Sequence, residues 1–466
     1  MTPSTNRRHL LKLASAATST LWLPRSAWSQ ARFSSNPFAL GVASGSPTHD
    51  SLVLWTRLVQ TGLFGTSTVG AAPVTVRWEI ADDEGFTRIV QSGQAQALAE
   101  LAHSVHVEVA GLASDRWYFY RFMAGDAVSP VGRTRTFPTP DAPAARLRVA
   151  YASCQRWEHG FYSAWRHMRA DAPDFVLFLG DYIYEYPNAV GAVRSPGGGW
   201  TVTLDDYRRR HALHKSDADL QAMHAACPWF VTWDDHEVQN DYAGLTPGDG
   251  GPAVADFAAR RAAAYQAFYE HMPLRASVLT RALQGLATGA ELRLYGQARL
   301  GQLATLYLLD ARQYKDAPVC TPAGEGASGY LDPAQCAVWD DPRRSMLGTA
   351  QEAWLAERMQ ASNATWQLLG QQVLFGRMKL PLSVFDNTTE DTINEYLQAV
   401  AARDGAKAQA FADRFEIPTA HAGYEALVAD PEVDAIYVNT THNFHAEHAL
   451  LAIRAGKPVL VEKAFT

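Results

Sequence analysis

The sequence predicts a mixed α/β protein with more than one domain, and three stretches support this prediction. Residues 37–138 contain short alternating apolar and polar runs separated by Gly, Asp and Ser turns, which is typical of a β-sandwich. Residues 145–387 alternate apolar strands with helical patterns, as expected for an α/β domain with a mostly parallel sheet. Residues 395–466 repeat the strand–helix alternation on a smaller scale. A chain of 466 residues can hold two or three such domains.

The composition is that of an ordinary globular protein, with 47% hydrophobic and 19% charged residues. The net charge of −7, without a basic run beyond the N-terminus, argues against a nucleic-acid-binding patch. No stretch reaches the roughly 18 uninterrupted apolar residues that indicate a stable membrane span. Four cysteines are too few for a disulfide scaffold. Cys320 and Cys336, however, flank a Gly/Pro-rich loop that a disulfide could close in an oxidising compartment.

Residues 1–30 are expected to be a targeting segment that takes no part in the fold. Paired arginines in Asn6–Lys12 precede a weakly apolar stretch, and a small-x-small site follows at Ala27–Ser29. These features resemble a twin-arginine export signal. The resemblance implies passage through the twin-arginine export machinery to a periplasmic or secreted location. The alternative is a disordered basic tail.

Three predicted strands end in side chains that suit metal binding. The apolar run Phe175–Leu179 leads into Gly180 and Asp181, the run from Val149 ends at Cys154, and the run from Trp229 ends at Asp235 and His236. Any one of these is equally typical of a strand followed by a polar turn. Because parallel strands deliver their carboxyl ends to one edge of a sheet, the three together predict a shared polynuclear metal centre.

The residue types at these strand ends suggest which cations would bind. One reaction that such a centre could catalyse is phosphoryl transfer, for which two-metal sites hold their cations about 3.5–4 Å apart. Asp181 is the candidate for the carboxylate that bridges the two cations. The thiolate of Cys154 and the phenolate of Tyr184 are soft, electron-rich donors suited to Fe³⁺. Asp235, His236 and Asn240 offer carboxylate, imidazole and amide donors. His236 could instead act as the acid that protonates the leaving group.

Arg312 follows another predicted strand that ends at Leu308-Leu-Asp310. Its guanidinium could hold a phosphate group through two parallel hydrogen bonds. A structural ion pair with Asp310 or with another carboxylate is an equally open alternative.

Several segments together resemble the alkaline phosphatase D (PhoD-type) family. They are Ala152–Gln155, Leu179–Tyr186, Trp233–Gly244, Leu309–Tyr314 and Met346–Leu355, with Gly41–Pro47 and Trp55–Arg57 resembling that family's N-terminal β-domain. The resemblance covers roughly residues 1–385. It implies a calcineurin-like metallophosphoesterase fold and a secreted phosphomonoesterase or phosphodiesterase with one Fe³⁺ and Ca²⁺. Carried over, Cys154 and Tyr184 would be iron ligands, Asp181 the bridge and Asn240 a calcium ligand, with the roles of Asp235 and His236 left open.

The C-terminal part departs from that family. The family's chain continues to a Gly-Asp-Val-His type motif that completes the metal site, and no such motif is present here. From about Leu397 the sequence instead resembles the Gfo/Idh/MocA oxidoreductases, as in Asp430–Val438 and Gly456–Lys463. That resemblance implies that Lys463 matches the active-site lysine, and that His442 and His445 match the nicotinamide-side loop. Because no Gly-x-Gly-x-x-Gly turn precedes Leu397, we do not expect NAD(P) to bind.

The sequence therefore predicts a β-sandwich, a C-terminally truncated metallophosphoesterase domain and a partial Rossmann-like domain. The expected reaction is attack of a metal-activated hydroxide on a phosphate monoester or diester, at a weak or undetectable rate because the distal ligands are missing. Strands without their neighbours should leave unpaired edges and apolar faces. Two alternatives are an NAD(P)-dependent oxidoreductase and a non-catalytic secreted binding protein.

Overall fold

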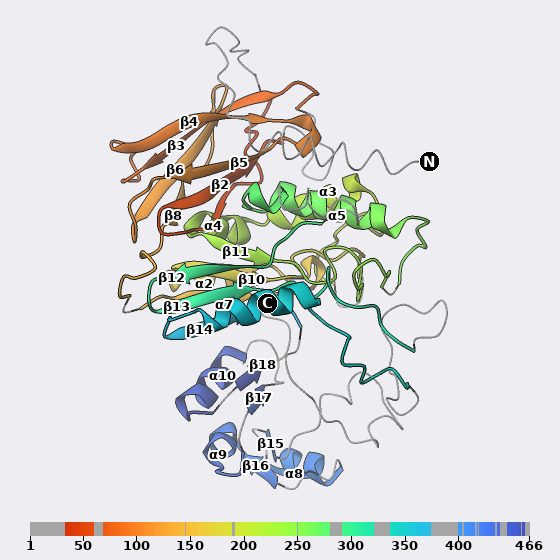
Figure 1. Cartoon of the computed structure of the whole chain (residues 1–466). Helices are drawn as coiled ribbons and strands as arrows, with labels where there is room; N and C mark the ends of the chain where they lie inside the picture. Colours follow the sequence, from red (N-terminus) through yellow and green to blue (C-terminus); the bar gives the residue numbers. More distant parts are fainter. Residues whose placement is uncertain are drawn as a thin grey trace. The chain divides into compact units, whose positions relative to one another are not determined.

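The computed structural model describes residues 33–59, 69–144, 146–188, 192–248, 250–279, 291–320 and 336–373 of the first part of the chain. Between residues 399 and 461 it describes all but 403–404, 415–416, 418, 434–435, 439–444 and 458. The chain divides into two compact units, Met1–Val373 and Leu374–Thr466 (Figure 1).

The N-terminal strands of the first unit form two antiparallel layers. In one layer β1 (Val42–Gly45) and β5 (Ser104–Ala110) flank β2 (Ser51–Arg57). The other layer contains β3 (Val74–Ala81), β4 (Ile89–Ala97), β6 (Trp117–Ala124), β7 (Ala127–Val128) and β8 (Gly132–Arg135). Alternate side chains of both layers, such as Leu52, Leu54, Val76 and Tyr120, are buried in one shared core. This burial follows from the period-two alternation in the sequence.

The first layer continues into a six-stranded sheet of order β5-β2-β1-β11-β10-β9. Its parallel half consists of β9 (Val149–Ala152), β10 (Phe175–Leu179) and β11 (Trp229–Thr232). The junction is the parallel pairing of Gly45 with Trp229. A Cβ atom at Gly45 would lie 2.6 Å from the carbonyl oxygen of Pro273, so a residue without a side chain is required where the strands meet. The sequence patterns, which indicated a separate sandwich, did not suggest this continuity.

The first unit also contains helices. They are α2 (Ser163–Ala170), α3 (Leu204–Lys215), α4 (Ala218–Ala226), α5 (Phe257–His271) and α7 (Thr349–Gln360). α3 and α4 follow each other closely and are separate helices, because Asp217 caps a new N-terminus by accepting hydrogen bonds from the backbone of Asp219 and Leu220. No helix in the described part of the chain combines the length and apolar composition needed to cross a membrane.

A second, three-stranded sheet lies against the first. Its strands are β12 (Gly296–Leu300), β13 (Ala304–Leu308) and β14 (Trp366–Gly370), in that order. Phe175, Leu177 and Phe230 of the first sheet share a core with Leu300 and Leu306 of the second. This packing brings the end of β13, and hence Arg312, close to the end of β11.

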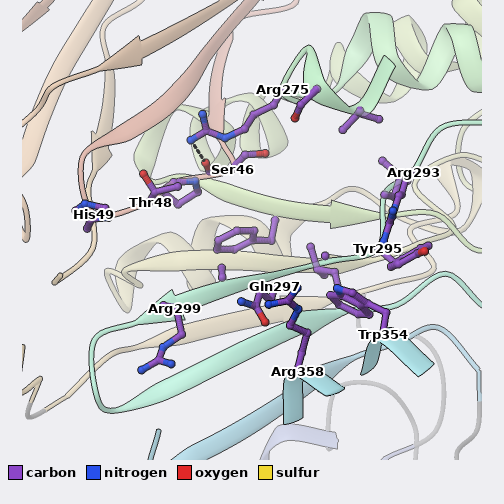
Figure 2. Close-up of a pocket in the computed structure, with 18 of the residues that line it drawn as sticks. Ser46, Thr48, His49, Arg275, Arg293, Tyr295, Gln297, Arg299, Trp354 and Arg358 are labelled. Atoms are coloured by element: carbon purple, nitrogen blue, oxygen red, sulfur yellow. Dashed lines mark hydrogen bonds between the residues drawn. The ribbon is translucent and has the colours of Figure 1, made fainter. Parts of the chain in front are cut away.

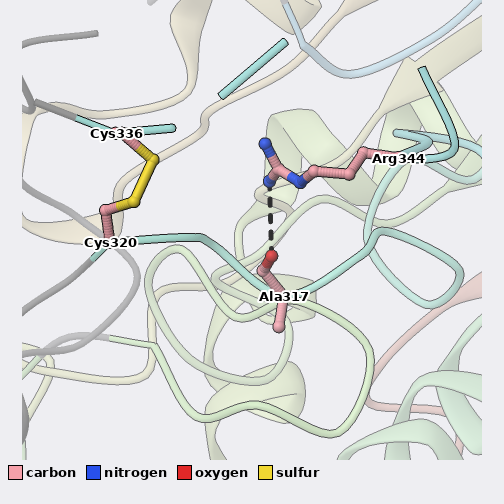
Figure 3. The surroundings of a disulfide bond; sticks show 4 residues. All are labelled: Ala317, Cys320, Cys336 and Arg344. Carbon is pink, nitrogen blue, oxygen red and sulfur yellow. Dashed lines mark hydrogen bonds between the residues drawn. A yellow bond between two sulfur atoms is a disulfide. The ribbon is translucent and has the colours of Figure 1, made fainter. Parts of the chain in front are cut away.

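A disulfide joins Cys320 and Cys336, as the sequence suggested (Figure 3). Their Cα atoms are 5.8 Å apart and they are separated by 16 positions in the chain. Nearby, the guanidinium of Arg344 donates a hydrogen bond to the carbonyl oxygen of Ala317 at 3.3 Å. The other two cysteines, Cys154 and Cys227, are buried and form no disulfide.

The second unit consists of short elements that form two parallel strand pairs. The pairs are β15 (Ala399–Ala402) with β16 (Thr419–Ala422) and β17 (Ile436–Val438) with β18 (Val459–Val461). The helices are α8 (Gly405–Arg414), α9 (Tyr424–Ala429) and α10 (His445–Arg454). Val428, Val433, Ile436 and Ala452 form a small core. These alternating strands and helices agree with the Rossmann-like pattern expected for this part.

Candidate metal centre

The ends of β9, β10 and β11 bring the predicted ligands together around Asp181. The thiol of Cys154 lies 3.2 Å from Oδ2 of Asp181, and the hydroxyl of Tyr184 lies 3.4 Å from the same oxygen. The backbone N–H of His236 donates to the other oxygen, Oδ1, at 3.4 Å. The two oxygens of this buried carboxylate therefore face different neighbours, which is the arrangement that a bridging ligand requires.

The backbone is strained at two of these positions. Cys154 and Asp181 have φ values of 59° and 56°, in the left-handed region that residues with a side chain seldom adopt. Two hydrogen bonds hold these turns together, from the N–H of Cys154 to the carbonyl of Gly180 and from the N–H of Gln155 to the carbonyl of Asp181. Gly180 itself has a φ of 98°, and a Cβ atom there would lie 2.3 Å from the backbone nitrogen of Asp234. Strain of this kind is concentrated at functional sites.

Glu237 fixes the turns after β10 and β11 relative to each other. Its buried carboxylate accepts backbone hydrogen bonds from Asp181 at 3.1 Å, Tyr182 at 2.6 Å and Asp234 at 2.9 Å. Glu237 lies within one of the family-like motifs, but no sequence pattern assigned it a role. A carboxylate that serves backbone donors from two different turns can be recognised only once the turns are adjacent.

Glu185 supports the imidazole side of the site in a similar way. One of its oxygens lies 2.7 Å from Nδ1 of His236, and the other accepts the backbone N–H of Asn240 at 2.6 Å. The side-chain amide of Asn240 donates to Asp241 at 3.3 Å. Glu185 was also missed as a functional residue, although it lies within the tyrosine-rich segment after β10.

The site concentrates negative groups in a buried environment. Burial raises the pKa of Tyr184 well above its usual value, and the neighbouring Asp181 and Cys154 raise it further. For His236, burial opposes protonation, but the carboxylates of Asp181, Glu185 and Asp235 outweigh it and raise the pKa of the imidazole to about 10. The shift of His236 indicates an excess of negative charge that a cation would neutralise.

The donor set also fits a cation by geometry. Ligand atoms of Asp181, Asp235 and His236 all lie within 4.8 Å of one another. Cys154 and Tyr184 add a thiol and a phenol on the side of Oδ2. A buried cluster of carboxylates, imidazole, thiol and phenol is suited to a transition metal together with a harder cation.

Arg312 lies beside this cluster and is engaged with carboxylates. Its guanidinium is 2.6 Å from Asp234, 3.4 Å from Asp235 and 3.3 Å from Asp241. Burial lowers the pKa of Arg312, but Asp234 and Asp235 outweigh it and raise this pKa above its usual value. Asp310, the partner suggested by the sequence, instead accepts the backbone N–H of Arg312 at 3.0 Å. Of the two alternatives left open, the structure thus contains the carboxylate pairing.

Of the three residues that the oxidoreductase resemblance assigns to NAD(P), only His445 lies among the described residues. His442 and Lys463 lie outside the described residues, and His445 is described only as the first residue of α10.

Comparison with known families identifies the larger part of the chain. The PhoD-like phosphatase family matches residues 149–414, and the N-terminal domain of PhoD-like phosphatases matches residues 24–138. The chain belongs to the PhoD-like phosphatase family. This PhoD-like chain is 46% identical over 369 residues to alkaline phosphatase D of Bacillus subtilis (strain 168), a match that covers 78% of the chain. A solved structure of PhoD aligns with a TM-score of 0.67 at 46% identity over 74% of the chain.

The PhoD-like chain spans 60% of the length of the Bacillus protein and 64% of the solved PhoD chain. Residues 376–466 match a different family, the oxidoreductases with an NAD-binding Rossmann fold. Within this part, 65 residues are 51% identical to trans-1,2-dihydrobenzene-1,2-diol dehydrogenase of Danio rerio, a match that covers 20% of that protein. The chain therefore joins a PhoD-like part to a short oxidoreductase-like part, as the sequence motifs predicted.

Proposed function

We propose that this PhoD-like protein is a metal-dependent hydrolase of phosphate monoesters or diesters. The observation that carries the proposal is the Asp181 carboxylate: the thiol of Cys154 and the hydroxyl of Tyr184 lie at one of its oxygens, and ligand atoms of Asp235 and His236 lie within 4.8 Å of it. Membership of the PhoD-like phosphatase family and the identity to an alkaline phosphatase D support the same reaction class.

Within this proposal Cys154 and Tyr184 would hold Fe³⁺, Asp181 would bridge, and Asn240 would contribute to a Ca²⁺ site. When bound, the cations would polarise the phosphoryl group and lower the pKa of an attacking water. Glu237 and Glu185 orient Asp181 and His236 through their hydrogen bonds. Asp235 and His236 would complete the cation site or, in the case of His236, deliver a proton to the leaving oxygen. Arg312 would exchange one of its carboxylate contacts for a substrate oxygen.

The proposal extends to domain organisation and location. We assign residues 37–138 to a β-sandwich, 145–387 to a calcineurin-like metallophosphoesterase domain and 395–466 to a partial NAD(P)-binding domain. We also assign residues 1–30 to a twin-arginine signal that directs the protein to the periplasm or the exterior. The disulfide between Cys320 and Cys336 supports an oxidising compartment.

The test combines metal analysis with hydrolysis of p-nitrophenyl phosphate and bis(p-nitrophenyl) phosphate. We expect the purified protein to contain iron and calcium, and Cys154→Ala to lose most of its iron and at least a hundredfold of any turnover. Cys227→Ala is the matched control, because Cys227 is also a buried thiol outside any disulfide but belongs to the hydrophobic core. The same assay tests the expectation of weak turnover. Iron content and turnover that both survive Cys154→Ala and Asp181→Asn would contradict the proposal.

A further inference from the structure

A second site of interest is a cavity of about 630 Å³ in the first unit. Its wall is formed by the segment after β1, residues around Arg275, the strand β12 with the residues before it, and α7 (Figure 2). None of the lining residues belongs to the candidate metal centre. The volume lies within the range of about 300–1,000 Å³ that is typical of small-molecule sites.

The charged side chains that line this cavity are all basic. Arg275, Arg293, Arg299 and Arg358 line it together with His49, and no aspartate or glutamate is among the described residues of its wall. The whole chain carries a net charge of −7, so a purely cationic lining is a local feature and does not follow from the composition. Such a lining favours an anionic ligand.

The arginines differ in how far their charges are already balanced. Arg275 is held by Glu108 at 3.2 Å and by the carbonyl of Ser46 at 2.7 Å, so it is positioned but largely neutralised (Figure 2). Arg293 and Arg299 form no ion pair with the carboxylates of the described residues. These two arginines therefore supply the uncompensated positive charge.

Arg293 and Arg299 also carry unsatisfied donors. In both, the Nε–H group is buried and has no hydrogen-bond partner within the described structure. Arg299 is nevertheless fixed, because its Nη2 donates to Asn363 Oδ1 at 2.8 Å. Both guanidinium groups therefore keep hydrogen-bonding capacity beyond their contacts within the described residues.

Aromatic rings line the same cavity. The rings of Tyr295 and Trp354 lie 5.1 Å apart, and the guanidinium of Arg293 stands over the Tyr295 ring at 4.2 Å (Figure 2). Phe230, Val278 and Leu294 add apolar surface. The cavity thus offers an aromatic wall beside a cationic one.

We propose that this cavity is a second ligand site, which binds an organic phosphate with a planar aromatic group, such as a nucleotide. Arg293 and Arg299 stand six positions apart along the chain and lie at opposite ends of the lining (Figure 2), so they would donate hydrogen bonds to different phosphate groups of an extended polyphosphate. The planar group would pack against Tyr295 and Trp354. This site is independent of the hydrolytic reaction proposed for the metal centre.

The test is titration calorimetry of the full chain with ATP in buffer containing EDTA, so that the metal centre neither binds nor hydrolyses the probe. We expect saturable binding that Arg293→Gln and Arg299→Gln together weaken at least tenfold. Arg343→Gln is the matched control, since Arg343 is an exposed arginine paired with Asp341 outside the cavity. Asp181→Asn should leave this binding unchanged and thereby separates the cavity from the metal centre.

Two further measurements separate phosphate recognition by the arginines from packing of the planar group on the aromatic rings: titration with inorganic phosphate, and the variant Trp354→Ala. We expect inorganic phosphate to bind at least tenfold more weakly than ATP, and Trp354→Ala to weaken ATP binding more than phosphate binding. Circular dichroism confirms that each variant is folded, and the single variant Arg299→Gln replaces the double variant if the latter unfolds. Absence of ATP binding, or ATP binding that the arginine variants do not change, would overturn the proposal. Equal affinity for ATP and phosphate would overturn the aromatic part.

Discussion

The residues with most influence on the metal centre include one that has no side chain. Gly180 allows the turn after β10 to lie against the turn after β11, since a Cβ atom would come within 2.3 Å of the Asp234 nitrogen. Its φ of 98° would also strain any other residue. The position of Asp181 therefore depends on the glycine before it.

We expect Gly180→Ala to destabilise the protein by about 3 kcal/mol or more, because it adds a backbone clash to an unfavourable φ. Urea unfolding measures the loss, and iron analysis measures the displacement of Asp181. Gly160→Ala is the control, since Gly160 has an extended backbone and a methyl group added there would have no atom within 4 Å. Equal unfolding midpoints for the two variants would refute this account.

Glu237 provides a second prediction at the residue scale. Its carboxylate accepts three backbone N–H groups, whereas the amide of a glutamine has a single acceptor oxygen. We expect Glu237→Gln to cost about 2 kcal/mol in the free energy of unfolding, because buried donors lose their acceptor. The control is Gln239→Glu, which changes the charge at a buried position two residues later. It tests whether any change of charge in this turn lowers the free energy of unfolding by the same amount. An unchanged urea midpoint for Glu237→Gln would show that the carboxylate is not needed to hold the turns.

At the scale of elements, the outermost strands of the two sheets expose large apolar side chains. Among the described strands, β9 is the last of the six-stranded sheet, with Tyr151 53% exposed, and β14 is the last of the three-stranded sheet, with Trp366 62% exposed. Within the described residues these side chains show exposed apolar faces, as the sequence predicts, while the unpaired edges stay a prediction. Such edges favour association between chains.

Tyr151→Lys combined with Trp366→Lys should therefore reduce self-association, because charge on an edge strand opposes pairing with another chain. Sedimentation velocity at several protein concentrations measures the effect. Phe161→Lys is the control, since Phe161 is 67% exposed but lies outside the strands. If all three proteins sediment alike, the strand edges do not drive association.

The disulfide acts on the long segment between β13 and α7. A cross-link between residues 16 positions apart lowers the entropy of the unfolded chain. In the loop-entropy description this adds about 3 kcal/mol to the free energy of unfolding. We expect the double variant Cys320→Ser, Cys336→Ser to unfold at a lower temperature than the parent protein. Dithiothreitol should lower the unfolding temperature of the parent to that of the variant, and should leave the variant unchanged. A parent protein insensitive to the reductant would contradict a stabilising role.

At the scale of the whole molecule, buried neutral histidines should make the protein sensitive to acid. Burial lowers the pKa of His214 to about 3, because it outweighs a hydrogen bond to the backbone of Arg210 that raises this pKa. Burial also lowers the pKa values of His211, His224 and His271. Because these groups take up protons more readily when unfolded, their contribution to stability is complete above about pH 6.5. It is lost as the pH falls further, until the folded-state pKa is reached.

His214→Gln should remove part of this acid sensitivity. Between about pH 6.5 and pH 5 the parent protein should lose about 2 kcal/mol more in the free energy of unfolding than the variant. Urea unfolding at both pH values provides the measurement. The exposed His49 gives a control substitution, His49→Gln, which should keep the acid sensitivity of the parent. Parallel pH profiles for the parent and His214→Gln would contradict the prediction.

The sequence by itself determined the strands that end in Cys154, Asp181 and Asp235-His236, the family of the larger part, and the different family character of the C-terminal part. These features are local, because apolar runs and short motifs are written in consecutive residues. Only the tertiary structure decided the roles of Glu237 and Glu185, the partners of Arg312, the joining of two predicted domains in one sheet, and the arginine-lined cavity. Each of these depends on contacts between segments far apart in the chain, for which periodicity and motif spacing carry no signal.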